Sequence, residues 1–139
     1  MYVTVPQFLM TTLATTRVLL VDDDSLVRLT LARILGDYPD LEVVGQAATG
    51  DEAISSVETL GPHVVIMDIR MPRMDGITAT REIKDKYPHV HIIGLSEYAY
   101  GYHADAMLKA GAAAVHQKAK ATEELYAAIK KVSGGHDSL

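Results

Sequence analysis

Residues 64–76 read Val-Val-Ile-Met-Asp-Ile-Arg-Met-Pro-Arg-Met-Asp-Gly, and this stretch is the most informative one in the chain. Its leading apolar residues are typical of a strand that is covered on both faces, as in a parallel sheet. Asp68 follows directly, and a carboxylate is expected at the rim of a sheet because burying it within one is costly. Pro72 and the Asp75-Gly76 pair suit the turn that follows, since proline presets φ and glycine permits a positive φ.

Outward from this stretch, short apolar runs alternate with segments of helical periodicity. Strands are predicted at residues 18–21, 41–45, 64–67, 92–95 and 112–115. Helices are predicted where apolar residues recur three and four positions apart, at Val27/Leu31/Ile34/Leu35, Ala53/Ile54/Val57/Leu60, Ala104/Met107/Leu108 and Leu125/Ala128/Ile129/Val132. Residues 77–86 form a weaker helical candidate. The alternation predicts an α/β fold with a doubly wound, five-stranded parallel sheet and helices on both of its faces.

The composition narrows the class of protein. A chain of 139 residues is expected to form one domain, and its 48% hydrophobic and 22% charged residues are those of a globular protein. The net charge of -5 lacks the basic footprint of a nucleic-acid binder, so we expect no direct contact with nucleic acid. The absence of cysteine excludes disulfides, zinc–thiolate sites and cysteine nucleophiles from this sequence, and it fits a reducing, cytoplasmic compartment.

The ends of the chain differ in composition from its middle. We predict that residues 1–16 form a flexible N-terminal extension, residues 17–133 the domain, and residues 134–139 a tail or the start of a linker. The first of these segments contains no lysine or arginine and several threonines, so it has the features of neither a secretory signal nor a membrane-spanning helix. No association with a membrane is therefore expected.

Carboxylates gather at the predicted carboxyl ends of two strands, which is where doubly wound domains place their functional groups. Asp22 and Asp23 follow the first strand, and Asp68 follows the third. Their mutual repulsion requires a counter-charge, and Mg²⁺ prefers carboxylate oxygens among its protein ligands. Asp24 and Ser25 are interpreted instead as the N-cap of the first helix.

Two further strand ends carry groups that suit a phosphoryl group. Ser96 follows the fourth strand and Lys118 the fifth, and a hydroxyl with an ammonium could hold phosphoryl oxygens. With these residues in place, the sequence resembles the receiver domains of two-component response regulators. The motifs that carry the resemblance are Val18-Leu-Leu-Val-Asp-Asp, Ile66-Met-Asp-Ile-Arg-Met-Pro-Arg-Met-Asp-Gly76, Ile93-Gly-Leu-Ser96, Ala110-Gly-Ala112 and Lys118.

The resemblance implies a flavodoxin-like (βα)5 fold with strand order 2-1-3-4-5. It also implies that Asp68 accepts a phosphoryl group from the phosphohistidine of a sensor histidine kinase or a phosphotransfer protein. Such a protein phosphorylates and dephosphorylates itself and is not a conventional turnover enzyme. The implied site residues are Asp22, Asp23, Asp68 and the backbone carbonyl of Arg70 for Mg²⁺, Ser96 as the switch hydroxyl, and Lys118 as the cation that pairs with the phosphate.

Two positions depart from the family pattern. Ala119 stands where receivers commonly have a proline after the lysine, so a trans peptide bond is expected there. Val115 stands where many receivers carry the aromatic residue of the switch. By resemblance, Arg70 and Tyr98 occupy the two positions that tune how long the phosphate survives.

Three tyrosines, Tyr98, Tyr100 and Tyr102, lie just before the fourth predicted helix. Tyrosine is favoured at interfaces because its ring offers apolar area with a polar tip. We interpret these residues as a docking surface for a partner or for a second subunit. In the second case the chain would form a homodimer on phosphorylation. The alternative left open is ordinary half-buried helix packing.

The output is not encoded in the motifs. Their wording is similar to that of receivers joined to helix-turn-helix domains, which favours transcription regulation through a downstream protein or a DNA-binding output domain that this chain lacks. One alternative is a Mg²⁺-dependent phosphohydrolase of the haloacid dehalogenase type with Asp22 as nucleophile, but Leu26 departs from that pattern and Asp68 would be left unused. A flavodoxin-like cofactor binder is a third reading, and the loops lack its phosphate-cradling glycines and hydroxyls.

Overall fold

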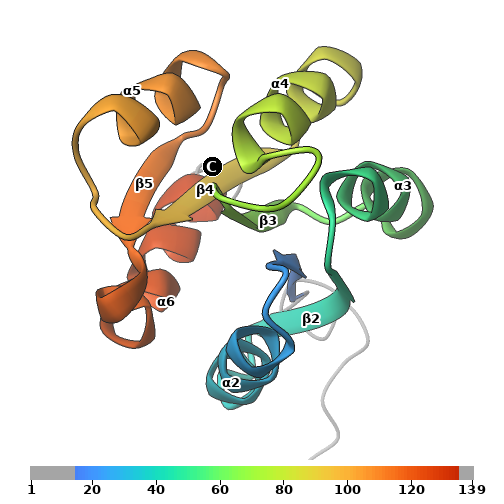
Figure 1. Cartoon of the computed structure of the whole chain (residues 1–139). Helices are drawn as coiled ribbons and strands as arrows, with labels where there is room; N and C mark the ends of the chain where they lie inside the picture. The colour runs from blue at the N-terminus through green and yellow to red at the C-terminus, as the bar shows by residue number, and fades with distance from the viewer. Residues whose placement is uncertain (1–14, 135–139) are drawn as a thin grey trace, which may run out of the picture.

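The computed structural model describes residues 15–134, in which strands and helices alternate (Figure 1). In chain order the elements are β1 (Thr16–Val21), α2 (Ser25–Gly36), β2 (Leu41–Ala47), α3 (Gly50–Leu60), β3 (Val64–Asp68), α4 (Gly76–Lys86), β4 (His91–Ser96), α5 (Tyr102–Lys109), β5 (Ala114–Gln117), the 3₁₀ turn η1 (Lys118–Lys120) and α6 (Ala121–Ser133). The sheet begins at Thr16, one residue before the predicted start of the domain. The predictions for residues 1–14 and 135–139 lie outside the described residues.

The five strands form one parallel sheet in the order β2-β1-β3-β4-β5, which confirms the predicted order. Leu20 of β1 lies between Gln46 of β2 and Ile66 of β3 in the register of the sheet. The chain therefore leaves β1 toward one edge and continues from β3 toward the other. In such sheets the crevice for ligands lies at the carboxyl ends of the strands where the order reverses, here β1 and β3.

Helices cover both faces of the sheet, with α2 and α6 on one face and α3, α4 and α5 on the other (Figure 1). Successive side chains of the central strands alternate between these two layers, as the pleat requires. Leu19 and Val65 belong to the cluster under α3, α4 and α5, whereas Leu20 and Ile66 belong to the cluster under α2 and α6. All four are almost fully buried, so β1 and β3 are rigid supports for the residues at their ends.

Helix N-caps account for several of the polar residues at the carboxyl rim. Asp24 caps α2 by accepting a hydrogen bond from the backbone N–H of Leu26 at 2.9 Å, which confirms its interpretation as a cap. Asp75 caps α4 by accepting from the N–H of Thr78 at 2.8 Å. Their carboxylates are therefore engaged in holding helices, unlike those of Asp22 and Asp68.

The structure corrects two of the predicted elements. The last strand is Ala114–Gln117, two residues later than predicted, because the N–H of Ala112 still bonds to the carbonyl of Met107 at 3.1 Å and closes the end of α5. Leu108 was predicted on the buried face of this helix, but α5 turns Ala104 and Met107 inward and leaves Leu108 47% exposed. The weak candidate at 77–86 is a full helix. No helix among residues 15–134 is long and apolar enough to cross a membrane.

Candidate functional site

An open hollow of about 680 Å³ lies at the carboxyl rim of the sheet. It is formed where β1, β3, β4 and β5 end, at the edge predicted to carry the chemistry. The residues that line it are Asp22, Asp23, Asp24, Asp68, Arg70, Ser96, Glu97, Tyr98, Gln117, Lys118 and Ala119. The structure thus brings together the candidate metal-ligating and phosphoryl-binding residues that the sequence distributed over four strand ends.

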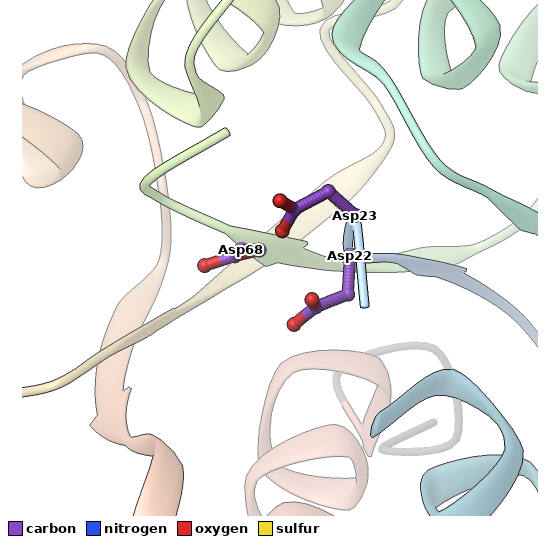
Figure 2. A group of neighbouring side chains, drawn as sticks. All are labelled: Asp22, Asp23 and Asp68. Atoms are coloured by element: carbon purple, nitrogen blue, oxygen red, sulfur yellow. The ribbon is translucent and has the colours of Figure 1, made fainter. Parts of the chain in front are cut away.

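Three of the carboxylates that line this hollow lie close together. Asp22 continues β1, since its N–H donates to the carbonyl of Ala47 in β2 at 3.1 Å, and Asp68 is the last residue of β3. One oxygen from each of Asp22, Asp23 and Asp68 lies within 4.8 Å of the others. Figure 2 shows the three carboxylates extending to the same side of the strand ends. Asp22 and Asp68 are 2% and 3% exposed, whereas Asp23 is exposed.

Lys118 supplies the positive charge of the site. It is the first residue of η1, and its Nζ lies 2.9 Å from Asp22 Oδ2 and 3.2 Å from Asp68 Oδ1. Backbone donors hold the same two carboxylates, from Asp24 N–H to Asp22 Oδ1 at 2.9 Å and from Arg70 N–H to Asp68 Oδ1 at 3.3 Å. A single ammonium therefore bridges two buried carboxylates.

The electrostatics of the site follow from this arrangement. Burial of the carboxyl, together with the charge of Asp22, raises the pKa of Asp68 to about 7 even though Lys118 acts to lower it. Burial alone would lower the pKa of Lys118, but its contacts with Asp22 and Asp68 outweigh burial and raise it. The ammonium thus stays charged, and negative charge remains in excess in the cluster.

The donor set fits a hard divalent cation. Among residues 15–134, Asp68 Oδ2 is buried and has no hydrogen-bond partner, and Asp22 Oδ2 is contacted only by the ammonium of Lys118. A buried carboxylate oxygen without a donor is costly, and a cation would relieve that cost. Mg²⁺ takes oxygen ligands in octahedral geometry, keeps several waters and needs only one or two carboxylates from the protein. The Asp22, Asp23 and Asp68 carboxylates fit that requirement.

The loop between β3 and α4 shapes one wall of the site, and here the sequence-based reason for Gly76 was wrong. Gly76 begins α4 without a positive φ, and the positive φ in this loop belongs to Arg73, at 69°. Glycine is needed at position 76 because a Cβ there would lie 2.0 Å from the carbonyl oxygen of Asp68. The N–H of Gly76 also donates to the carbonyl of Ile69 at 2.8 Å, which closes the loop next to Asp68.

The remaining predicted residues divide into two groups. Ser96 is buried at the end of β4, and together with Arg70 and Tyr98 it lines the same hollow as Asp68. Tyr100 and Tyr102 lie outside the hollow and are 76% and 81% exposed, which overturns the alternative of half-buried packing for this segment.

The two departures from the family pattern are accommodated without distortion. Val115 packs against the buried cluster under α5. Ala119 lies in η1, and no cis peptide bond occurs among the described residues, as expected for the Lys118–Ala119 bond.

Sequence reasoning missed two residues, Arg28 and Gln46, that are linked to the site by hydrogen bonds outside the hollow. Arg28 of α2 donates from Nη1 to the carbonyl of Asp22 at 2.6 Å and from Nε to Gln46 Oε1 of β2 at 3.1 Å. Both residues are ordinary polar positions in the sequence. A possible signal was a basic residue one helical turn after the N-cap Asp24, where it would lie close to the end of the preceding strand.

Comparison with known proteins gives a consistent result. Residues 18–130 match the family described as the response regulator receiver domain. The chain is 37% identical over 119 residues to the response regulator GacA of Pseudomonas protegens, covering 86% of this chain and 56% of GacA. It is 38% identical over 123 residues to the uncharacterized transcriptional regulatory protein YhcZ of Bacillus subtilis, covering 88% of this chain and 57% of YhcZ. The response regulator domain of Thermotoga maritima CheB is similar in structure, with a TM-score of 0.80, 31% identity, and coverage of 85% of this chain and 96% of that domain. The chain thus spans little more than half the length of GacA and of YhcZ.

Proposed function

Because this chain belongs to the response regulator receiver family, we propose that it is a signalling switch that accepts a phosphoryl group on Asp68. The donor is the phosphohistidine of a histidine kinase or of a phosphotransfer protein. The observation that carries the proposal is the ammonium of Lys118, which lies between the buried carboxylates of Asp22 and Asp68 at 2.9 and 3.2 Å. That arrangement holds a nucleophile and a phosphate-binding cation in contact within one hollow.

The reaction uses the side chains that line the hollow, the phosphodonor and a bound Mg²⁺. A carboxylate oxygen of Asp68 attacks the phosphorus, the bond between phosphorus and the donor's imidazole nitrogen breaks, and the leaving nitrogen keeps the electron pair and takes up a proton from water. Lys118 Nζ pairs with the phosphoryl oxygens, and Ser96 Oγ donates to them once they are in place. Mg²⁺, held by Asp22, Asp23, Asp68 and the carbonyl of Arg70, would offset the repulsion between the carboxylates and the incoming phosphoryl group.

Phosphorylation then changes the partners of two side chains. Lys118 exchanges its contact with the Asp68 carboxylate for the phosphoryl oxygens, and Ser96 gains an acceptor. New contacts of this kind shift a two-state equilibrium only by the difference in their free energy between the two states. Since Lys118 lies between β5 and α6, and Tyr98 follows Ser96 closely, the readout is expected on the surface beside these elements.

An apolar groove next to the site is where we place the phosphodonor. This groove of about 280 Å³ lies between α2 and α6, and Lys118 lines both it and the phosphorylation site. Leu26 lines this groove and is 68% exposed, and Leu29 of the same helix is 54% exposed. A donor protein that brings its phosphohistidine to Asp68 must contact this rim, and the exposed Leu26 there offers it an apolar contact.

A second surface, formed by Tyr98, Tyr100 and Tyr102, is proposed for the downstream partner or for a second copy of the chain after phosphorylation. These side chains are 54%, 76% and 81% exposed. They lie on the segment that follows Ser96, so a change at the switch hydroxyl reaches them directly along the chain. YhcZ is named as an uncharacterized transcriptional regulatory protein, and we propose that this chain likewise serves transcription regulation through an output domain.

The test is the intact mass of the protein after incubation with acetyl phosphate and Mg²⁺. The expected result is a gain of one phosphoryl group that disappears in EDTA and in Asp68→Asn. Absence of labelling in the folded wild-type protein would contradict the proposal. Labelling that persists in Asp68→Asn and is lost in Asp22→Asn would instead support the haloacid dehalogenase-type phosphohydrolase, which the family match does not favour.

A further inference from the structure

The side chain of Arg28 contacts the acidic cluster through the backbone of Asp22 and not through a carboxylate. Its Nη1 donates to the main-chain carbonyl of Asp22 at 2.6 Å, and its Nε donates to Gln46 Oε1 at 3.1 Å. Arg28 lies in the first turn of α2, where its own N–H bonds to the carbonyl of Asp24 at 3.2 Å. One guanidinium therefore connects α2, the end of β1 and β2.

The carbonyl that Arg28 holds determines how the next residue is oriented. The carbonyl of Asp22 and the N–H of Asp23 belong to the same rigid peptide plane. The N–H of Asp22 is already fixed by the carbonyl of Ala47 at 3.1 Å. With both peptide groups that flank Asp22 bonded, the backbone at this point has little rotational freedom, and the direction in which Asp23 leaves the chain is set.

Asp23 depends on this restraint more than its neighbours do. The Asp22 carboxylate is held by the N–H of Asp24 and by Lys118, and the Asp68 carboxylate is held by Lys118 and the N–H of Arg70. No hydrogen bond or ion pair within residues 15–134 holds the carboxylate of Asp23. Its place in the cluster therefore comes from the backbone alone.

We propose that Arg28 is a positioning residue that aims the Asp23 carboxylate at the cation by fixing the Asp22–Asp23 peptide. The proposal rests on the proposed function, because it assigns a role toward the same Mg²⁺ site. Gln46 completes the device, since it anchors Nε and leaves Nη1 directed at the carbonyl. A planar guanidinium can make both bonds at once in a fixed geometry, which the single ammonium of a lysine cannot.

The positioning role and a simple charge effect predict opposite results. A cationic guanidinium close to the cluster repels Mg²⁺, so loss of its charge alone would tighten Mg²⁺ binding. Loss of the restraint on Asp23 would weaken Mg²⁺ binding, because a ligand that must be ordered on binding costs affinity. The sign of the change therefore separates the two.

The experiment is a titration of the full chain with Mg²⁺ alone, followed by NMR, for wild type, Arg28→Gln, Arg28→Lys, Gln46→Ala and the matched control Arg33→Gln on the exposed last turn of α2. We expect Arg28→Gln to raise the Mg²⁺ dissociation constant about 10-fold, as is typical when a group that orients a metal ligand is lost. Arg28→Lys should lie between wild type and Arg28→Gln, and Arg33→Gln should match wild type. Gln46→Ala should have a smaller effect that vanishes in the Arg28→Gln background.

Two further measurements distinguish weaker Mg²⁺ binding from a loss of the folded structure. Unfolding midpoints in EDTA should change little, and the rate of phosphorylation by acetyl phosphate should recover at saturating Mg²⁺. Unchanged or tighter Mg²⁺ binding in Arg28→Gln overturns the positioning role, as does a deficit that saturating Mg²⁺ does not repair. If Arg28→Gln is unfolded, Arg28→Lys decides by the same criteria. Phosphorylation of wild type on Asp68 with unchanged variants would overturn this inference alone, whereas a wild type that binds no Mg²⁺ would overturn the metal site of the proposed function.

Discussion

The ammonium of Lys118 lies 3.2 Å from Asp68 Oδ1 and joins the end of the edge strand β5 to the end of the central strand β3. The same ammonium contacts Asp22 at the end of β1. Three strand ends are thereby held together by one charge. Lys118 is also the first residue of η1, which leads into α6, so this one residue connects the ends of β1, β3 and β5 with the start of α6.

Replacement of Lys118 by methionine removes the positive charge and keeps an unbranched side chain, so it tests the role of the charge. We expect Lys118→Met to slow phosphorylation by acetyl phosphate about 100-fold, in the range seen when one preorganised donor is removed. The pKa of Asp68 should rise further, because Lys118 is the cation that lowers it. The measurement is the rate of mass gain, with Lys120→Met on exposed η1 as the control. A wild-type rate in Lys118→Met would show that the ammonium is not used.

The raised pKa of Asp68 makes the stability of the folded protein depend on pH. The pKa is about 7 in the folded protein and 3.8 in the unfolded chain, so the folded state binds more protons between these values. The free energy of unfolding should therefore fall as pH rises through this window. Asp68→Asn removes the titrating group. We expect its free energy of unfolding to exceed that of wild type by about 2–4 kcal/mol at pH 8 and by little near pH 4.

Urea denaturation in EDTA at both pH values measures this difference. Asp85→Asn, on the exposed side of α4, is the matched control and should show no such dependence. Equal stability of wild type and Asp68→Asn at pH 8 would mean that the buried carboxylate carries no penalty.

A methyl group at position 76 should disrupt the site from within. We expect Gly76→Ala to lower the free energy of unfolding by about 1–3 kcal/mol, as overpacking does, because its Cβ would lie 2.0 Å from the carbonyl oxygen of Asp68. Phosphorylation should also slow, since the clash is with the backbone of Asp68 and Ile69 and its relief would distort the loop next to Asp68. Gly36→Ala is the control, as a Cβ there meets nothing within 4 Å. The measurements are the free energy of unfolding and the rate of phosphorylation of Gly76→Ala and Gly36→Ala. Equal values in the two variants would contradict the close approach of residue 76 to Asp68.

Arg70 and Tyr98 line the hollow without contributing to the buried clusters. Arg70→Ala and Tyr98→Ala should therefore change the rate at which phosphate is lost from Asp68 while leaving the unfolding midpoint close to that of wild type. The measurement is the decay of the phosphorylated mass after removal of acetyl phosphate. A parallel change in stability and decay rate would show that these side chains act through the fold and not on the phosphate.

Much of the architecture was predictable because its signals are local. The apolar runs that became β1 to β4 are long enough to be recognised one at a time, and glycine and proline mark the ends of the helices. The alanine-rich run at 112–115 was placed two residues early because small apolar residues suit a helix end and a strand equally. Leu108 was misassigned because the periodicity does not say how far a short helix turns from the sheet.

The residue types and their place at strand ends already pointed to a carboxylate and lysine site with phosphoryl chemistry, since parallel strands bring their carboxyl ends to one edge. The bridge from Lys118 to two carboxylates, the pKa of Asp68, the bond from Arg28 to Asp22 and the closeness of Gly76 to Asp68 appear only in the folded chain. Each depends on a distance between residues that are separate in sequence, or on burial by two layers of helices. A linear pattern carries neither quantity, so the tertiary structure alone settles them.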